Sequence, residues 1–155
     1  MILLVSYLPV SSSKEVSLDF LDSSGSNTAF IFFGFRGCTD VCPLTLAKLS
    51  QFVSQPSGSS RPQVLFIDID RNNHPKDADE YAKQFHTSFR GIKPSTPEIN
   101  ELASLFGIPV REQGFVLAHA GKTYFLRKDQ SGQWSWVKTY PAGAFDPRDL
   151  LEELY

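Results

Sequence analysis

The chain has 155 residues, of which 41% are hydrophobic and 13% aromatic, as expected for one globular domain with an ample core. The net charge of −2, without a basic run, disfavours nucleic-acid binding, and no stretch reaches the roughly 18–20 apolar residues of a membrane span. We therefore interpret residues 1–155 as a single domain. The apolar start (MILLVSYLPV) lies in residues 1–15, which are either a strand or the remnant of a targeting or anchor segment.

The first half of the chain predicts a strand, a helix and a second strand. After a candidate strand at residues 16–20, the apolar run 28–35 (TAFIFFGF) predicts a strand buried on both faces. Residues 42–53 carry apolar side chains at helical spacing, and residues 63–69 (QVLFIDI) predict a second central strand. This order predicts a right-handed unit with parallel strands.

The second half predicts helices and a hairpin. Residues 75–86 have an amphipathic helical pattern, and a third helix begins at Ser95 or Thr96, with Pro97 in its first turn, and ends at Gly107. Three strands follow, the last two as a hairpin: residues 114–118, 122–127 and 134–139.

A final helix is predicted after the hairpin. Asp146 caps it, and Pro147 occupies its first position. Three leucines would face the sheet: Leu150, Leu151 and Leu154. The complete order predicts an α/β fold with a central mixed β-sheet flanked by helices.

The two cysteines, Cys38 and Cys42, lie where a buried strand passes into a helix. Residues four apart lie on one side of a helix, so both sulfurs can face one point. The N–H groups and dipole at a helix N-terminus favour a thiolate, the form that attacks disulfides and binds metals, while Asp40 opposes thiolate formation but suits a cation. The spacing alone does not separate redox chemistry from metal binding, and two inert core residues are the plainer alternative.

A metal site needs a third ligand, and the chain has three histidines. His74 lies in a polar turn and is expected to be solvated. His86 ends a predicted helix, where a structural role is favoured. His119 lies between an apolar strand and a glycine-containing turn, and its position leaves a ligand and a loop residue equally open.

Residues 32–49 (FFGFRGCTDVCPLTLAKL) closely resemble the signature of the SCO/SenC family, thioredoxin-like copper chaperones for cytochrome c oxidase assembly. Further segments resemble the family in the same order: 66–71 (FIDIDR), 91–107 (GIKPSTPEINELASLFG), Ala118-His119 with 123–126 (TYFL), and 140–143 (YPAG). The resemblance covers about residues 27–155.

The resemblance implies a thioredoxin-like fold and one copper ion, Cu(I) or Cu(II), bound by Cys38, Cys42 and His119. It implies a metallochaperone rather than an enzyme, delivering copper to the copper-binding subunit of cytochrome c oxidase or to another copper-dependent client, with a thiol reductant as a second partner. The implied location is the periplasm or cell envelope. Ala118 replaces an aspartate of the family pattern, which removes a carboxylate next to the site.

The main alternative is a thiol-disulfide oxidoreductase that keeps the copper-site cysteines of a client reduced. Cys38 and Cys42 would then be the catalytic redox pair, with His119 as a bystander. A peroxide-handling thioredoxin-like protein is less favoured, because the expected Pro-x-x-x-Thr-x-x-Cys pattern is absent. A redox or copper sensor is the remaining hypothesis.

Overall fold

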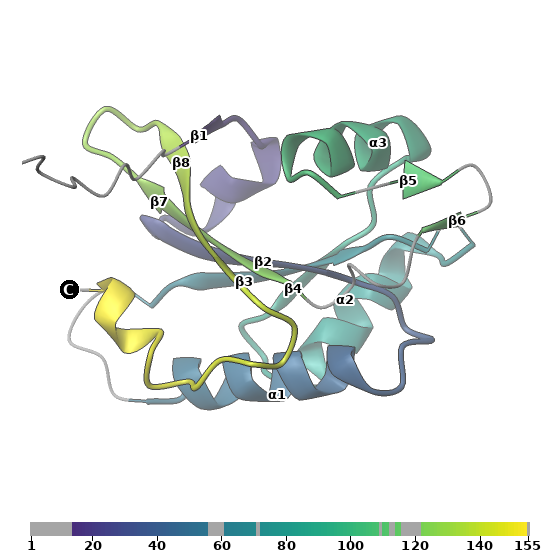
Figure 1. The fold of residues 1–155 in the computed structure, drawn as a ribbon, viewed down its shortest axis with the longest axis horizontal. Helices are drawn as coiled ribbons and strands as arrows, with labels where there is room; N and C mark the ends of the chain where they lie inside the picture. The colour runs from purple at the N-terminus through teal and green to yellow at the C-terminus, as the bar shows by residue number, and fades with distance from the viewer. Residues whose placement is uncertain are drawn as a thin grey trace, which may run out of the picture.

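The computed structural model describes residues 14–55, 61–70, 72–108, 110–111, 114–115 and 122–154. Its centre is a six-stranded mixed sheet in the order β1-β8-β7-β2-β3-β4, with helices on both faces (Figure 1). The strands are β1 Lys14–Val16, β2 Thr28–Gly34, β3 Gln63–Asp68, β4 Arg90–Ile92, β7 Thr123–Lys128 and β8 Trp134–Tyr140, and a separate ribbon pairs β5 Val110–Arg111 with β6 Gly114–Phe115. The helical segments are η1 Asp19–Ser24, α1 Val41–Val53, α2 Pro75–Lys83, α3 Thr96–Leu105 and η3 Leu151–Leu154.

The predicted strand–helix–strand unit is confirmed. β2 pairs parallel with β3, and α1 connects the two strands. Every residue of β2 after the first is buried, as its continuous apolar sequence predicted. The register places Gly34 opposite Asp68, so the carboxyl ends of β2 and β3 lie together at one edge of the sheet. The loops that leave these two strands are therefore neighbours.

Each face of the sheet has its own core. Phe30 and Phe32 of β2 pack in the core shared with α1 and α2, whereas Ile31 and Phe33 pack on the opposite face with α3. Figure 1 shows α1 and α2 below the sheet and α3 above it. This alternation follows from the two-residue period of a strand. In the part of the chain described above, no helix is long and apolar enough to cross a bilayer.

A short strand that the sequence did not predict, β4, forms the edge beside β3. A Cβ atom at Gly91 would lie 1.9 Å from the carbonyl oxygen of Ala78 in α2, so only glycine allows this approach of helix to strand. The Gly91 N–H donates to Asp79 Oδ1 at 3.0 Å. Three residues with a central glycine carry no alternating pattern, which explains why β4 was missed.

Several predicted boundaries are wrong. Residues 16–20 are not a strand: β1 ends at Val16, and a 3₁₀ segment begins at Asp19, in a region rich in turn-forming Asp and Ser. α2 ends at Lys83 rather than at His86. The predicted strand 114–118 is observed only as β6, and its residues 116–118, like residues 1–13, lie outside the described residues.

The end of the chain also differs from the prediction. In place of a final α-helix, turns at residues 147–150 precede the 3₁₀ segment η3. Asp146 does accept the Arg148 N–H, at 2.8 Å, but so short a segment does not sustain a helix. The expected leucine packing is nevertheless confirmed, because Leu150 is buried and Leu151 and Leu154 pack against the α1-side core.

The third helix and the hairpin are confirmed. Ser95 and Glu98 form a capping box at the start of α3, and Gly107 after its end has a positive φ of 63°. β7 and β8 pair antiparallel as predicted. These elements have strong local signals, which tertiary packing does not override.

Candidate cysteine site

The two cysteines come together at the carboxyl end of β2. Cys38 lies in the loop between β2 and α1, and Cys42 is the second residue of α1, with Pro43 in the same first turn. Both are free cysteines. The Cys42 N–H donates to Cys38 Sγ at 3.4 Å, so one of the otherwise unpaired N–H groups of the helix start points at sulfur. The two residues are therefore in contact, although Cys38 lies in the loop before α1 and not on the helix itself.

The two sulfurs have different surroundings. Cys38 is half-buried, whereas Cys42 is fully buried in the α1-side core, together with Phe30 and Phe32. Gly34 leaves the space for this thiol, because a Cβ atom there would lie 3.1 Å from Cys42 Sγ. Cys38 is therefore the sulfur that a partner in solution reaches first.

Burial, and to a smaller extent the hydrogen bond with the Cys38 thiol, raise the pKa of Cys42 to about 12. A hydrogen bond from the Phe35 backbone N–H acts in the opposite direction, but burial dominates. The sequence-based expectation that the helix N-terminus lowers the thiol pKa is thus wrong for Cys42. Cys42 holds its proton until a metal or a disulfide partner displaces it.

Tyr81 of α2 lies near the two thiols. Its ring packs on Phe66 and Phe85, with centroids 5.2 Å and 5.4 Å away. Burial raises the pKa of the Tyr81 hydroxyl, and the neighbouring Cys42 and Cys38 raise it further. The sequence placed Tyr81 on the buried face of its helix but gave no signal that it approaches the cysteines.

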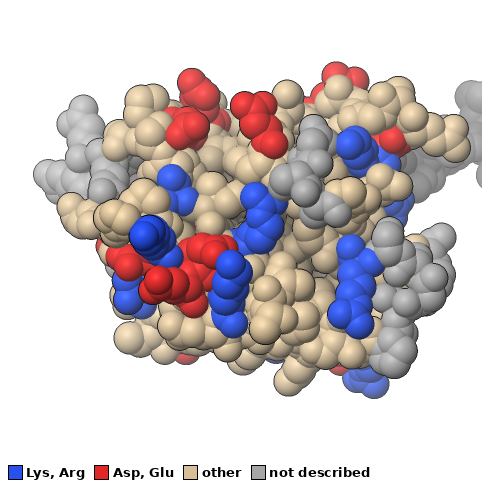
Figure 2. Space-filling model, turned by 180° about the vertical axis from the view of Figure 1, so that it is seen from behind, with Lys and Arg blue, Asp and Glu red and all other residues tan. Residues whose placement is uncertain are grey.

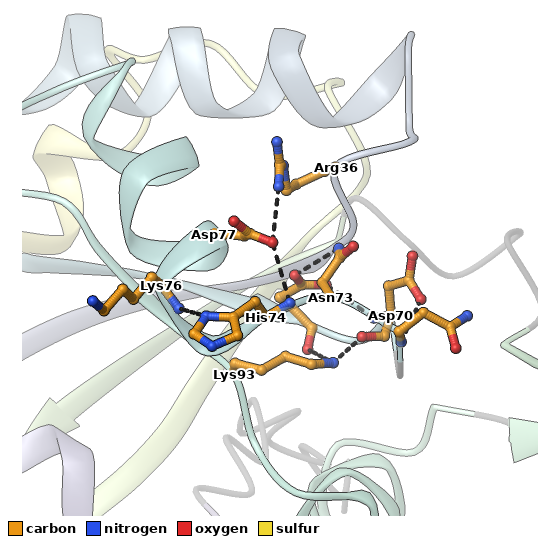
Figure 3. Close-up of polar contacts among 9 residues, drawn as sticks. Arg36, Asp70, Asn73, His74, Lys76, Asp77 and Lys93 are labelled. Carbon is orange, nitrogen blue, oxygen red and sulfur yellow. Dashed lines mark hydrogen bonds and ion pairs between the residues drawn. The ribbon is translucent and has the colours of Figure 1, made fainter.

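A second loop, residues 68–70 and 72–73, follows β3 at the same edge of the sheet (Figure 3). Asp68 is fully buried, and its carboxylate accepts the Asp70 N–H and the Asn73 side-chain amide, each at 2.9 Å. Burial raises the pKa of Asp68. Lys93, which follows β4, donates to the carbonyl oxygens of Asp68 and Asp70. Side chains therefore hold this loop in place.

An ion pair joins the cysteine loop to α2. Arg36 Nη1 lies 3.1 Å from Asp77 Oδ2 (Figure 3). The same Asp77 oxygen accepts the His74 N–H at 3.1 Å, and the His74 ring accepts the Lys76 N–H at 3.3 Å. His74 is exposed, as predicted, and in addition it caps α2, a role that the sequence did not predict for it. His86 is structural as predicted, because its ring contacts Ser88 Oγ at 2.7 Å and packs on Phe89.

The third predicted ligand cannot be placed beside the sulfurs. His119, with the preceding Ala118, lies outside the described residues, so the set of Cys38, Cys42 and His119 stays a prediction. Among the residues described, no group of three or more His, Cys, Asp or Glu side chains could hold a metal ion. The structure brings together two sulfur donors, which suit a soft metal ion or a disulfide bond.

Comparisons with known proteins add to this geometry. Residues 20–154 match the SCO1/SenC family. A SCO2-like protein of Rickettsia conorii is 29% identical over 143 residues, which cover 86% of this chain and 67% of that protein. The structure of Arabidopsis thaliana ScoI with copper bound aligns at a TM-score of 0.67 and 22% identity, covering 83% of this chain and 81% of the other.

A third similar protein is BsSco, described as a member of the Sco family of cytochrome c oxidase assembly proteins with a disulfide switch. It aligns at a TM-score of 0.58 and 19% identity over 83% of this chain and 78% of the other. A mixed sheet between helical layers, with two cysteines where a central strand passes into a helix, defines a thioredoxin-like protein. Because the family match spans nearly the whole sequence, this chain belongs to the SCO1/SenC family.

Proposed function

We propose that this chain binds one copper ion through Cys38, Cys42 and His119 and delivers it to the copper-binding subunit of cytochrome c oxidase or to another copper-dependent client. The observation that carries the proposal is the pair of free sulfurs at the start of α1, joined by the 3.4 Å contact between the Cys42 N–H and Cys38 Sγ. Copper in the related ScoI structure and the assembly role given for BsSco support the same reading.

The donor set fits copper as cargo. Thiolates are soft ligands that suit Cu(I), and an imidazole completes a three-coordinate site from which the ion can be transferred. Cys38 is half-buried on a loop, so an incoming client thiolate can replace it as a ligand without any change in copper oxidation state. Cys42 lies deeper and would release the ion last.

Loading requires the cysteines to be reduced and to lose their protons. The high pKa of Cys42 means that protons compete with copper for this sulfur, so copper affinity should fall as the pH is lowered. A thiol reductant that opens any Cys38–Cys42 disulfide is therefore a second partner. We place this activity in the cell envelope, where the family resemblance puts it.

Anaerobic competition for Cu(I) against a chromophoric chelator tests the proposal. We expect one Cu(I) per chain, and we expect His119→Ala to weaken binding at least about tenfold, while Cys38→Ser and Cys42→Ser abolish tight binding. His86→Ala is the matched control, because that ring contacts Ser88 and Phe89. Equal affinities for His119→Ala and the parent chain would show that the three-ligand site is wrong.

A second candidate function, thiol-disulfide exchange, is favoured by the hydrogen bond between the two thiols. In that reaction Cys38 and Cys42 form a disulfide, and their two electrons and two protons reduce a disulfide of the client to two thiols. Turnover of a model disulfide in metal-free buffer, sustained by a thiol reductant and unaffected by His119→Ala, would support this reaction over copper delivery.

A further inference from the structure

An apolar groove lies away from the cysteines, between η1 and α3. It has a volume of about 460 Å³, within the range of ligand-binding clefts. We define the groove by the apolar residues that line it: Leu18, Phe20, Ile92, Pro94, Leu102 and Leu105. Four of them, Leu18, Phe20, Ile92 and Leu105, are only partly buried against the α3-side core. Among the residues that the structure describes, the groove thus presents apolar surface that no other side chain fully covers.

The two walls of the groove are fixed to the rest of the fold. Arg90 Nη1 donates to the Phe20 carbonyl oxygen at 3.2 Å, which joins the η1 wall to β4. Lys14 Nζ donates to the Leu105 carbonyl oxygen at 2.8 Å, which joins the end of α3 to β1. A partner would therefore meet a preformed site and would lose little free energy in ordering it.

The polar groups around the groove indicate which partner it fits. The three nearby cations already donate to backbone carbonyl oxygens: Lys14, Arg90 and Lys93. Glu98 accepts from the Ser95 backbone N–H at 2.7 Å. Asp19 and Glu101 also line the groove, both are exposed, and neither has a hydrogen bond or ion pair within the described part of the chain.

The three cations and the three carboxylates around the groove balance in formal charge, but they differ in how many of their hydrogen bonds are already made. The cations are engaged, whereas two carboxylates remain as acceptors beside apolar surface. Figure 2 views the molecule from behind and shows acidic side chains along the upper edge of the face that it presents. An incoming Lys or Arg side chain supplies donors for these carboxylates, whereas an anionic ligand would offer them only further acceptors.

We propose that the groove binds a short extended segment of a partner protein that combines apolar side chains with at least one Lys or Arg. The apolar side chains fill the space above Ile92 and Leu102, and the basic side chain bonds to Asp19 or Glu101. This docking site is independent of copper, and it does not require the proposed function of the cysteine pair to be correct.

Selection from a phage-displayed library of random heptapeptides, with the reduced metal-free chain as target, tests the proposal. The selection is repeated on the double variant Asp19→Lys/Glu101→Lys, which changes only exposed side chains. Glu80→Lys, an exposed position on α2, is the matched control. Thermal melts of all three proteins establish that the variants are folded.

We expect peptides with apolar residues and Lys or Arg to be enriched on the parent chain. A synthetic copy should bind the parent and Glu80→Lys equally in fluorescence anisotropy and lose at least tenfold affinity on the double variant. Peptides that lack basic residues, no enrichment over the double variant, or equal binding to it would overturn the proposal. Self-association of the parent that the double variant abolishes would also overturn it, because the occupant would then be a second copy of the chain.

Discussion

Two loops leave neighbouring parallel strands at the same edge of the sheet, and they differ in how their polar groups are used. In the loop after β3, the buried carboxylate of Asp68 accepts both a backbone N–H and a side-chain amide. The polar groups of this loop therefore hydrogen-bond to one another. In the loop after β2, backbone N–H groups point at sulfur: the Cys42 N–H at Cys38 and the Phe35 N–H at Cys42. The loop after β3 is held by its own hydrogen bonds, whereas the loop after β2 makes weak hydrogen bonds to the two sulfur atoms, which a ligand can replace.

The largest expected effect comes from removing the buried carboxylate of the loop after β3. Asp68→Ala leaves the Asp70 N–H and the Asn73 amide without their buried acceptor, which should cost about 2–3 kcal/mol of unfolding free energy in urea denaturation. Asp70→Ala is the control, because within the described part of the chain its carboxylate accepts only the exposed Asn72 N–H, and we expect a cost of less than about 1 kcal/mol. Equal losses for the two variants would contradict the comparison.

The second-largest effect is a difference between the two cysteines in how much their substitution lowers the free energy of unfolding. Cys42→Ser places a hydroxyl in an apolar core, and we expect a loss of about 1–2 kcal/mol in unfolding free energy. Cys38→Ser on the half-buried loop should stay within about 0.5 kcal/mol of the parent chain. Denaturation of the reduced proteins measures both, and a larger loss at Cys38 would show that the assignment of the buried sulfur is wrong.

Alkaline pH should destabilise the protein through Cys42. Its pKa rises from 9.0 to about 12 on folding, so above pH 9 the unfolded chain releases the proton while the folded chain retains it, and unfolding becomes easier. The stability is fully present below pH 9 and should fall by about 1 kcal/mol by pH 10. Cys42→Ser should lack this decrease, whereas the effect of Tyr124, whose pKa is raised to about 12 from 10.0, begins at higher pH.

The smallest effect concerns the link between the cysteine loop and α2. Arg36→Gln breaks the 3.1 Å ion pair with Asp77, and because both side chains are substantially exposed we expect a loss of 0–1 kcal/mol that shrinks in high salt. Asn at position 77 retains an acceptor for the His74 N–H. A double-mutant cycle with Asp77→Asn therefore isolates the ion pair, and a coupling energy well above 1 kcal/mol would reveal an unexpectedly strong clamp.

Elements with strong local patterns could be predicted from the sequence. The apolar run of β2, the helical spacing of α1 and the cap of α3 at Ser95, with Pro97 in its first turn, each predicted the observed structure. β4 could not be predicted, because its three residues carry no periodic signal and depend on the contact of Gly91 with Ala78. The 3₁₀ ending of the chain was missed because caps and leucines alone do not decide between helix types.

The cysteine site also has features that the sequence predicted and features that it did not. The position of Cys38 and Cys42 at a strand-to-helix junction followed from the sequence, and so did the family. The direction of the Cys42 pKa shift did not, because it depends on burial against residues such as Phe32, which are distant in the chain. His74 as a cap depended on its pairing with Lys76 and Asp77. His119 as a ligand remains a prediction.

The bond from the Cys42 amide to Cys38 Sγ has a spectroscopic consequence. The chemical shift of a backbone proton depends on the charge and bonding of its acceptor. The amide resonance of Cys42 in a ¹⁵N-labelled sample should therefore move when Cys38 is oxidised, alkylated or bound by a metal ion. This single cross-peak would report the state of the outer sulfur without any attached dye.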